Sequence, residues 1–176
     1  SNVVASVTNN TLFCNGKNVS FSSNSINGTN YFWDFGDPAR TSDSSNLQNP
    51  SYTYVDTGTY EVMLIVNKGW PCSDTIIQTI RVHYPANAAF NFNGALCLNN
   101  GAVTFTPTSN NAFTDQFAWN FGPDATPSTS NSKHPPPVTF STAGNHVVAL
   151  EVNSFGCIKT VYDTVKIYNK PSIGFS

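Results

Sequence analysis

Apolar and polar residues alternate along short stretches of this chain, and turn-forming residues separate the stretches. Residues 60–66 carry large apolar side chains at every second position, and residues 19–21 and 31–35 follow the same pattern. Period 2 in runs of this length is typical of half-buried β-strands. No segment shows a helical period. Six or seven strands in each stretch of about 85 residues predict a small β-sandwich.

One string of residue types occurs twice in the chain. Residues 33–36 (WDFG) align with residues 119–122 (WNFG), and the ten residues from Gly58 align with the ten from Gly144, both at an offset of 86. Several blocks that keep their order and spacing indicate a structural repeat. The predicted all-β fold is therefore two tandem sandwiches, at residues 1–83 and 84–170. Residues 171–176 are predicted to begin a further repeat or a linker.

The tryptophan of each string is predicted to lie in the core. Trp33 and Trp119 occur in phase with other aromatic residues on what should be the central strand of each unit. The alternative is an exposed platform for a ligand. Each tryptophan is followed by a glycine, Gly36 or Gly122, that suits a tight turn.

The residue after each tryptophan is predicted to hold that turn. The Asp34 carboxylate should accept hydrogen bonds from backbone N–H groups, and the amide oxygen of Asn120 should do part of the same work. Asp34→Ala is then expected to destabilise the first unit by about 1–3 kcal/mol in urea melts. An unchanged melt would contradict this role.

A second turn precedes the longest strand of each unit. Gly58 is expected to adopt a positive φ there, and the hydroxyl of Tyr60 is expected to return to the backbone as a tyrosine corner. In the second unit Gly144 and His146 occupy these positions. The hydroxyl contact must therefore be replaced or lost in that unit.

Composition and charge exclude several classes of function. Charged residues make up 10% of the chain and the net charge is −2, so a nucleic-acid partner is not expected. No apolar run approaches the roughly 20 residues that span a bilayer, so membrane insertion is not expected either. No catalytic site is predicted, because His83, His134 and His146 accompany no recognisable nucleophile.

The four cysteines occur two in each unit. Cys14 and Cys72 are 58 residues apart, and Cys97 and Cys157 occupy matching places 60 residues apart. Four cysteines allow three pairings, of which the repeat favours Cys14–Cys72 and Cys97–Cys157. Four buried free thiols are the alternative. Disulfides would indicate a compartment outside the cytosol, and no CxxC spacing suggests zinc.

Two segments of the first unit resemble the PKD (polycystic kidney disease) domain. They are residues 33–37 (WDFGD) and 49–67 (NPSYTYVDTGTYEVMLIVN). The second unit is more divergent, with Asn120 and His146 at two motif positions, but it keeps the frame. The resemblance implies an immunoglobulin-like sandwich without catalytic residues, used for spacing, display or adhesion. The cysteine pattern is similar to that of PKD repeats in large bacterial surface adhesins exported by the type IX secretion system, including those of gliding bacteria.

The predicted function is therefore a non-catalytic, extracellular structural or adhesive repeat pair. It would act as a spacer or display stalk in a large bacterial surface protein, such as a gliding-motility adhesin. Its partners would be neighbouring repeats of the same chain and a surface polysaccharide or another surface protein. The alternative is a carbohydrate- or protein-binding accessory module of a secreted enzyme.

Two groups of residues are candidates for ligand contact. Trp70 and Phe155 precede the second cysteine of each unit and offer aromatic rings to a sugar or a partner. The favoured interpretation is that both rings cover disulfides. The oxygen ligands of Asp34, Asp37 and Asp43 suit Ca²⁺. A structural turn without a cofactor is the favoured interpretation of this second group.

Overall fold

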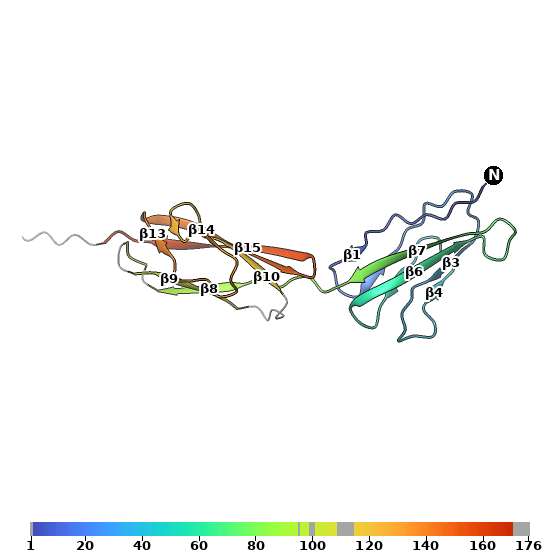
Figure 1. Cartoon of the computed structure of the whole chain (residues 1–176), viewed down its shortest axis with the longest axis horizontal. Helices are drawn as coiled ribbons and strands as arrows, with labels where there is room; N and C mark the ends of the chain where they lie inside the picture. The colour runs from blue at the N-terminus through green and yellow to red at the C-terminus, as the bar shows by residue number, and fades with distance from the viewer. Residues whose placement is uncertain (1, 95, 99–100, 109–114, 171–176) are drawn as a thin grey trace, which may run out of the picture. The chain divides into compact units, whose positions relative to one another are not determined.

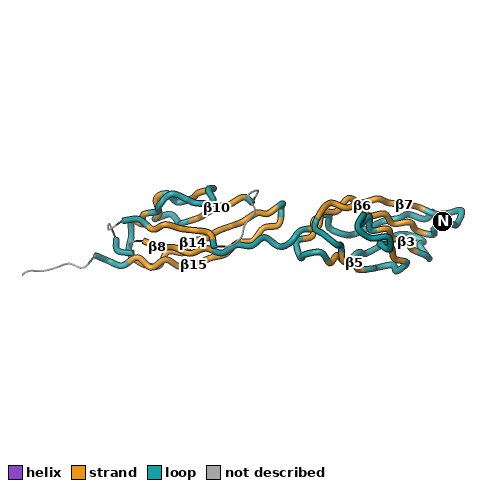
Figure 2. The backbone as a smooth tube through the Cα atoms, turned by 90° about the horizontal axis from the view of Figure 1, so that it is seen from below, coloured by secondary structure: helices purple, strands orange, loops and turns teal. Residues whose placement is uncertain are grey.

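The computed structural model describes residues 2–94, 96–98, 101–108 and 115–170 of the chain. All regular elements among these residues are β-strands, which confirms the predicted all-β class (Figure 1, Figure 2). No helix in this part of the chain is long and apolar enough to cross a membrane. The chain divides into two compact units, Ser1–Pro85 (unit 1) and Ala86–Ser176 (unit 2). The further repeat predicted at residues 171–176 lies outside the described residues.

Unit 1 contains a five-stranded sheet in the order β1-β7-β6-β3-β4 and a separate pair, β2-β5. The two long strands β6 and β7 form an antiparallel hairpin, and β1 is added to β7 in parallel. The bounds are β1 (Leu12–Phe13), β2 (Asn18–Ser20), β3 (Tyr31–Asp34), β4 (Ser44–Ser45), β5 (Ser51–Thr53), β6 (Gly58–Val66) and β7 (Asp74–Val82).

Unit 2 repeats this arrangement around a four-stranded sheet in the order β12-β10-β14-β15. Two smaller pairs, β8-β9 and β11-β13, complete the unit. The bounds are β8 (Phe90–Gly94), β9 (Val103–Pro107), β10 (Gln116–Asn120), β11 (Ala125–Thr126), β12 (Thr129–Ser130), β13 (Thr139–Phe140), β14 (Gly144–Ser154) and β15 (Cys157–Ile167).

The two central strand pairs share one register. Trp33 of β3 pairs with Leu64 of β6, and Trp119 of β10 pairs with Leu150 of β14. Both positions of each pair shift by 86 between the units, which is the offset of the sequence repeat. Because side chains alternate between the two faces of a strand, a shared register sends equivalent residues to the same face.

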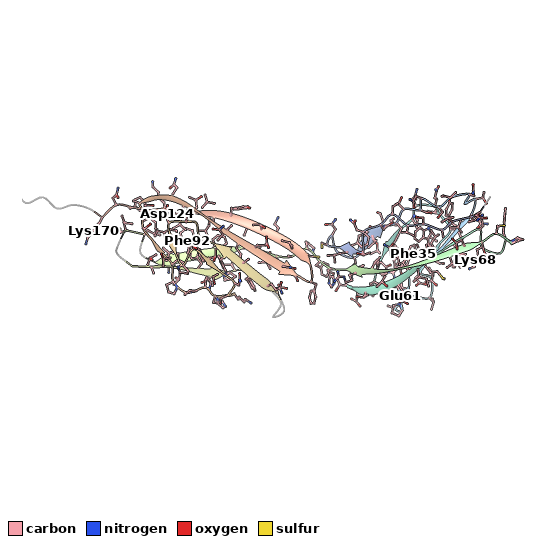
Figure 3. The ribbon with its side chains drawn as sticks, turned by 45° about the horizontal axis from the view of Figure 1, so that its top comes forward. Phe35, Glu61, Lys68, Phe92, Asp124 and Lys170 are labelled. Carbon is pink, nitrogen blue, oxygen red and sulfur yellow. The ribbon has the colours of Figure 1, made fainter. Side chains whose placement is uncertain are left out.

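Each unit has its own aromatic core under the central strands. In unit 1 the Phe21 ring lies 5.5 Å from Trp33 and 5.1 Å from Phe35, measured between centroids. In unit 2 the Phe105 ring lies 5.9 Å from Trp119 and 4.9 Å from Phe121. Tilted rings at such distances pack favourably. Figure 3 shows Phe35 within unit 1.

Candidate functional site

The two repeated tryptophans are core residues. Trp33 is fully buried and Trp119 is 2% exposed. Each indole N–H donates a hydrogen bond of 3.0 Å to a backbone carbonyl, from Trp33 to Leu47 and from Trp119 to Ser132. A buried ring whose polar atom is already satisfied is not available to a ligand. The alternative of an exposed platform is therefore wrong at both positions.

The turn after each tryptophan contains the hydrogen bond expected from the sequence. The N–H of Gly36 donates to Oδ1 of Asp34 at 3.0 Å, and the N–H of Gly122 donates to Oδ1 of Asn120 at 2.9 Å. Both glycines have a positive φ, 64° at Gly36 and 93° at Gly122. A carboxylate and an amide oxygen thus make the same contact.

The turn of unit 1 is further fixed by a buried carboxylate. Asp37 is 2% exposed, and its oxygens accept hydrogen bonds of 3.1 Å from the N–H of Ala39, the N–H of Val55 and the hydroxyl of Tyr52. Burial alone would raise the pKa of Asp37, but these hydrogen bonds outweigh it and the pKa is lowered. Burial and the nearby Asp37 raise the pKa of Tyr52 to about 12. In the repeat alignment, unit 2 has Pro123 at this position.

The acidic residues of this turn act as backbone acceptors. The carboxylate of Asp43 accepts a hydrogen bond of 2.8 Å from the N–H of Asp37. Asp34 and Asp37 accept hydrogen bonds from the N–H groups described above. Among the described residues, no group of three or more His, Cys, Asp or Glu side chains is arranged to hold a metal ion. The geometry therefore offers no support for the calcium alternative at Asp34, Asp37 and Asp43.

The tyrosine corner is present in unit 1 and has an imidazole counterpart in unit 2. The hydroxyl of Tyr60 donates to the carbonyl of Asp56 at 2.7 Å. Nε2 of His146 lies 3.0 Å from the carbonyl of Thr142, the equivalent position four residues earlier. The contact is thus replaced rather than lost.

The glycine beside this corner behaves differently in the two units. Gly144 has a φ of 136°, whereas the φ of Gly58 is not positive. The expectation for Gly58 was therefore wrong. Gly58 is the first residue of β6 and pairs with Val82. Gly144 also begins its strand and pairs with Ile167, so pairing in the ladder does not by itself account for the difference.

The predicted disulfide pairs are contradicted by the structure, because Cys72 and Cys97 are free thiols. Cys14 follows β1, whose Phe13 pairs with Val82 at the end of β7. Cys72 precedes the start of the same nine-residue strand. Nine residues of strand span about 30 Å, whereas a disulfide bridges Cα atoms at most about 7 Å apart.

The same geometry excludes the pair predicted in unit 2. The backbone of Cys97 forms an isolated β-bridge with that of Tyr168, just beyond the end of β15. Cys157 is the first residue of that eleven-residue strand, at its opposite end. Cys14 and Cys157 are each disulfide-bonded. The repeat therefore identified equivalent positions, but equivalence did not show that the two cysteines of each unit lie at opposite ends of a long strand.

Trp70 and Phe155 lie in the hairpin turns β6–β7 and β14–β15. Trp70 is 58% exposed and Phe155 is 55% exposed. The favoured interpretation, that the rings cover disulfides, fails for Trp70 because Cys72 is free. Exposure of this kind is what the binding alternative requires.

A groove of about 660 Å³ crosses the outer face of unit 2, and the sequence interpretation missed it. We call it the β10–β14 groove. Its lining includes Gln116, Ala118, Asn131, Lys133, Glu151 and Asn153. One signal in the sequence marks it. At the repeat offset of 86, the small Ala118 replaces Phe32 and the charged Glu151 replaces Ile65.

Comparison with known proteins identifies the fold of unit 1 more closely. Residues 2–83 match the PKD domain family, so a PKD domain is present there. The PKD1 domain of Vibrio anguillarum Epp is 29% identical, over 48% of this chain and 98% of that chain, with a TM-score of 0.40. No curated protein sequence matches the chain.

Two other solved structures resemble the chain over nearly its whole length. The fibronectin(III)-like modules of Clostridium thermocellum CbhA are 9% identical, over 98% of this chain and 100% of theirs, with a TM-score of 0.50. A structure of carbohydrate-binding modules from the β-sandwich superfamily is 16% identical, over 96% of this chain and 85% of that chain, with a TM-score of 0.42. The similarity to the fibronectin(III)-like modules supports the β-sandwich fold.

Proposed function

We propose that this chain is a non-catalytic, extracellular pair of PKD-type repeats that serves as a spacer or display stalk in a large bacterial surface protein. A gliding-motility adhesin exported by type IX secretion is the specific parent that we propose. Unit 2 is proposed to be a second, divergent PKD domain at residues 84–170. Its partners would be neighbouring repeats, with a surface polysaccharide or surface protein as the external partner.

The observation that carries this proposal is how the repeated residues are used. Both tryptophans are buried and satisfied, and Asp34 and Asn120 hold equivalent turns. The residues that recur in the two units therefore serve the fold. Disulfide-bonded cysteines are typical of oxidising compartments, which supports an extracellular location.

A surface-display assay tests the spacer role. The whole chain is placed between a membrane anchor and a terminal epitope on a host bacterium, and capture by antibody-coated beads is counted. The chain should improve capture over a short Gly/Ser linker, and an unrelated pair of β-sandwiches should substitute for it. Capture no better than with the short linker would contradict the proposal.

A second candidate is a carbohydrate- or protein-binding accessory module of a secreted enzyme. The exposed rings of Trp70 and Phe155 favour it, since exposed aromatic side chains on turns are suited to stacking on a ligand. A binding screen against insoluble polysaccharides, with Trp70→Ala as the variant, separates this candidate from a pure spacer. Retention that Trp70→Ala abolishes would support it.

A further inference from the structure

We propose that the β10–β14 groove of unit 2 binds a neutral oligosaccharide. This inference adds a specific site to the binding candidate above and does not depend on the stalk role. It rests on the size of the groove, on the chemistry of its lining and on a direct comparison with the equivalent surface of unit 1.

The groove lies over the central strands of the sheet. Gln116 and Ala118 face outward from β10, because Phe117 and Trp119 between and beyond them are buried. On β14 the paired residues are Asn153, opposite Gln116, and Glu151, opposite Ala118. The volume of about 660 Å³ is within the roughly 300–1,000 Å³ typical of small-ligand sites. Because these residues lie on β10 and β14, strands position most of the lining.

The lining combines donors with acceptors around a small apolar patch. The side-chain amides of Gln116 and Asn131 make no hydrogen bond to any described residue, so both can donate and accept. Glu151 adds an acceptor and Lys133 adds a donor, while Ala118 leaves the floor open. Sugar hydroxyls both donate and accept, so this mixture suits a polyhydroxylated ligand.

The charges of the groove favour a neutral ligand over an anionic one. Glu151 and Asp115 place two carboxylates in the lining, against one ammonium group from Lys133. An anionic glycan or a phosphate polymer would meet net repulsion at this site. The ammonium lies 5.7 Å from the centroid of the Phe117 ring, within reach of a cation–π contact.

An exposed aromatic ring lies on the same sheet face. Tyr162 of β15 is 70% exposed and pairs with Ala149. Ala149 lies two residues along β14 from Glu151, so the two pairs share one face of the sheet. The face of a tyrosine ring packs well against the apolar face of a sugar. A chain of several sugars that fills the groove can therefore extend toward this ring.

The equivalent surface of unit 1 has a smaller hollow, which Phe32 partly fills. Phe32 and Ile65 pair where unit 2 has Ala118 and Glu151, and the ammonium of Lys68 lies 3.2 Å from the centroid of the Phe32 ring. The hollow that remains there is about 270 Å³. Figure 3 shows Lys68 near the β6–β7 end of unit 1. The same frame thus offers a large groove in one unit and a much smaller hollow in the other.

The test is isothermal titration of the full chain with neutral oligosaccharides of four to six sugars, and with sulfated and uronic-acid oligosaccharides for comparison. We expect saturable binding of at least one neutral compound. Ala118→Phe, which installs the residue of unit 1, should weaken binding at least tenfold. The matched control Phe32→Ala in unit 1 should stay within about twofold.

A second variant guards against misfolding of Ala118→Phe. The double variant Gln116→Ala/Asn131→Ala changes only exposed side chains and should also weaken binding at least tenfold. Absence of binding to every neutral compound, preference for the anionic set, or unchanged affinity in the double variant would overturn the proposal. The bead-capture assay of the stalk role is unaffected by any of these outcomes.

Discussion

Unit 1 and unit 2 pair their central strands in the same register, yet they differ in how they stabilise their turns and in what they present on the outer sheet face. Unit 1 fixes the turn after its tryptophan with the buried Asp37, whereas unit 2 has Pro123 there. Unit 1 covers its outer face with Phe32, whereas unit 2 leaves the β10–β14 groove open over Ala118. The comparison teaches that a repeated core fixes the fold while unmatched surface positions remain available for function.

The largest expected effect is the one that should be equal in both units. Trp33→Ala and Trp119→Ala should each destabilise their own unit by about 3–5 kcal/mol, because each removes a buried ring and a satisfied indole N–H. Hydrogen exchange followed by mass spectrometry separates the units, since peptides from β3 and β6 report on one and peptides from β10 and β14 on the other. If only one of the two variants destabilised its unit, the equivalence of the two tryptophans would be contradicted.

The next effect should be found in unit 1 alone. Asp37→Ala should cost roughly 2–4 kcal/mol, because it leaves the buried N–H groups of Ala39 and Val55 and the hydroxyl of Tyr52 without an acceptor. Pro123→Ala, at the equivalent place in unit 2, should change stability by less than about 1 kcal/mol. Urea melts of both variants, assigned by the same peptides, check the difference. Equal losses would contradict the special role of Asp37.

The two turn glycines should also differ. Gly122→Ala should cost about 1–2 kcal/mol, for its positive φ alone. Gly36→Ala should cost at least about 1 kcal/mol more, because a Cβ there would lie 2.3 Å from the carbonyl oxygen of Glu61, while nothing lies within 4 Å at Gly122. Thermal melts of the two variants measure this. A larger loss at Gly122 would show that backbone crowding does not distinguish the turns.

The smallest effect is a difference in acid sensitivity. The pKa of Asp37 is lower in the folded unit than the ordinary value of 3.8. The unfolded chain therefore binds more protons as the pH falls below that value, and the stabilisation by the carboxylate is lost as the pH passes through the folded pKa. Unit 1 should lose stability relative to unit 2 below about pH 4, and Asp37→Asn should reduce that loss. Hydrogen exchange between pH 5 and pH 2 measures it, and parallel losses in wild type and variant would contradict it.

Much of the fold could be predicted because it follows local rules. Period 2 in the aromatic runs placed Trp33 and Trp119 in the core, and the string that follows each of them indicated a turn held by Asp34 or Asn120. The tyrosine corner at Tyr60 follows from residue type and spacing in the same way. These features depend on residues that are close in the sequence.

The rest depended on contacts that a repeat alignment does not contain. The separation of Cys14 from Cys72 depends on the length of β7 and on which of its ends β1 joins. The groove depends on Ala118 meeting Glu151 across two strands, which requires the register of β10 with β14. Comparing aligned positions for differences, in addition to similarities, would have drawn attention to Ala118.

The most direct test of the central claim, that the β10–β14 groove of unit 2 binds a ligand and the equivalent surface around Phe32 in unit 1 does not, is an NMR titration of the full chain with the tightest-binding neutral oligosaccharide. The account predicts amide shift changes at Gln116–Ala118 and Glu151–Asn153, and none at the equivalent residues around Phe32 and Ile65. Changes of similar size on both units, or changes centred on unit 1, would contradict it.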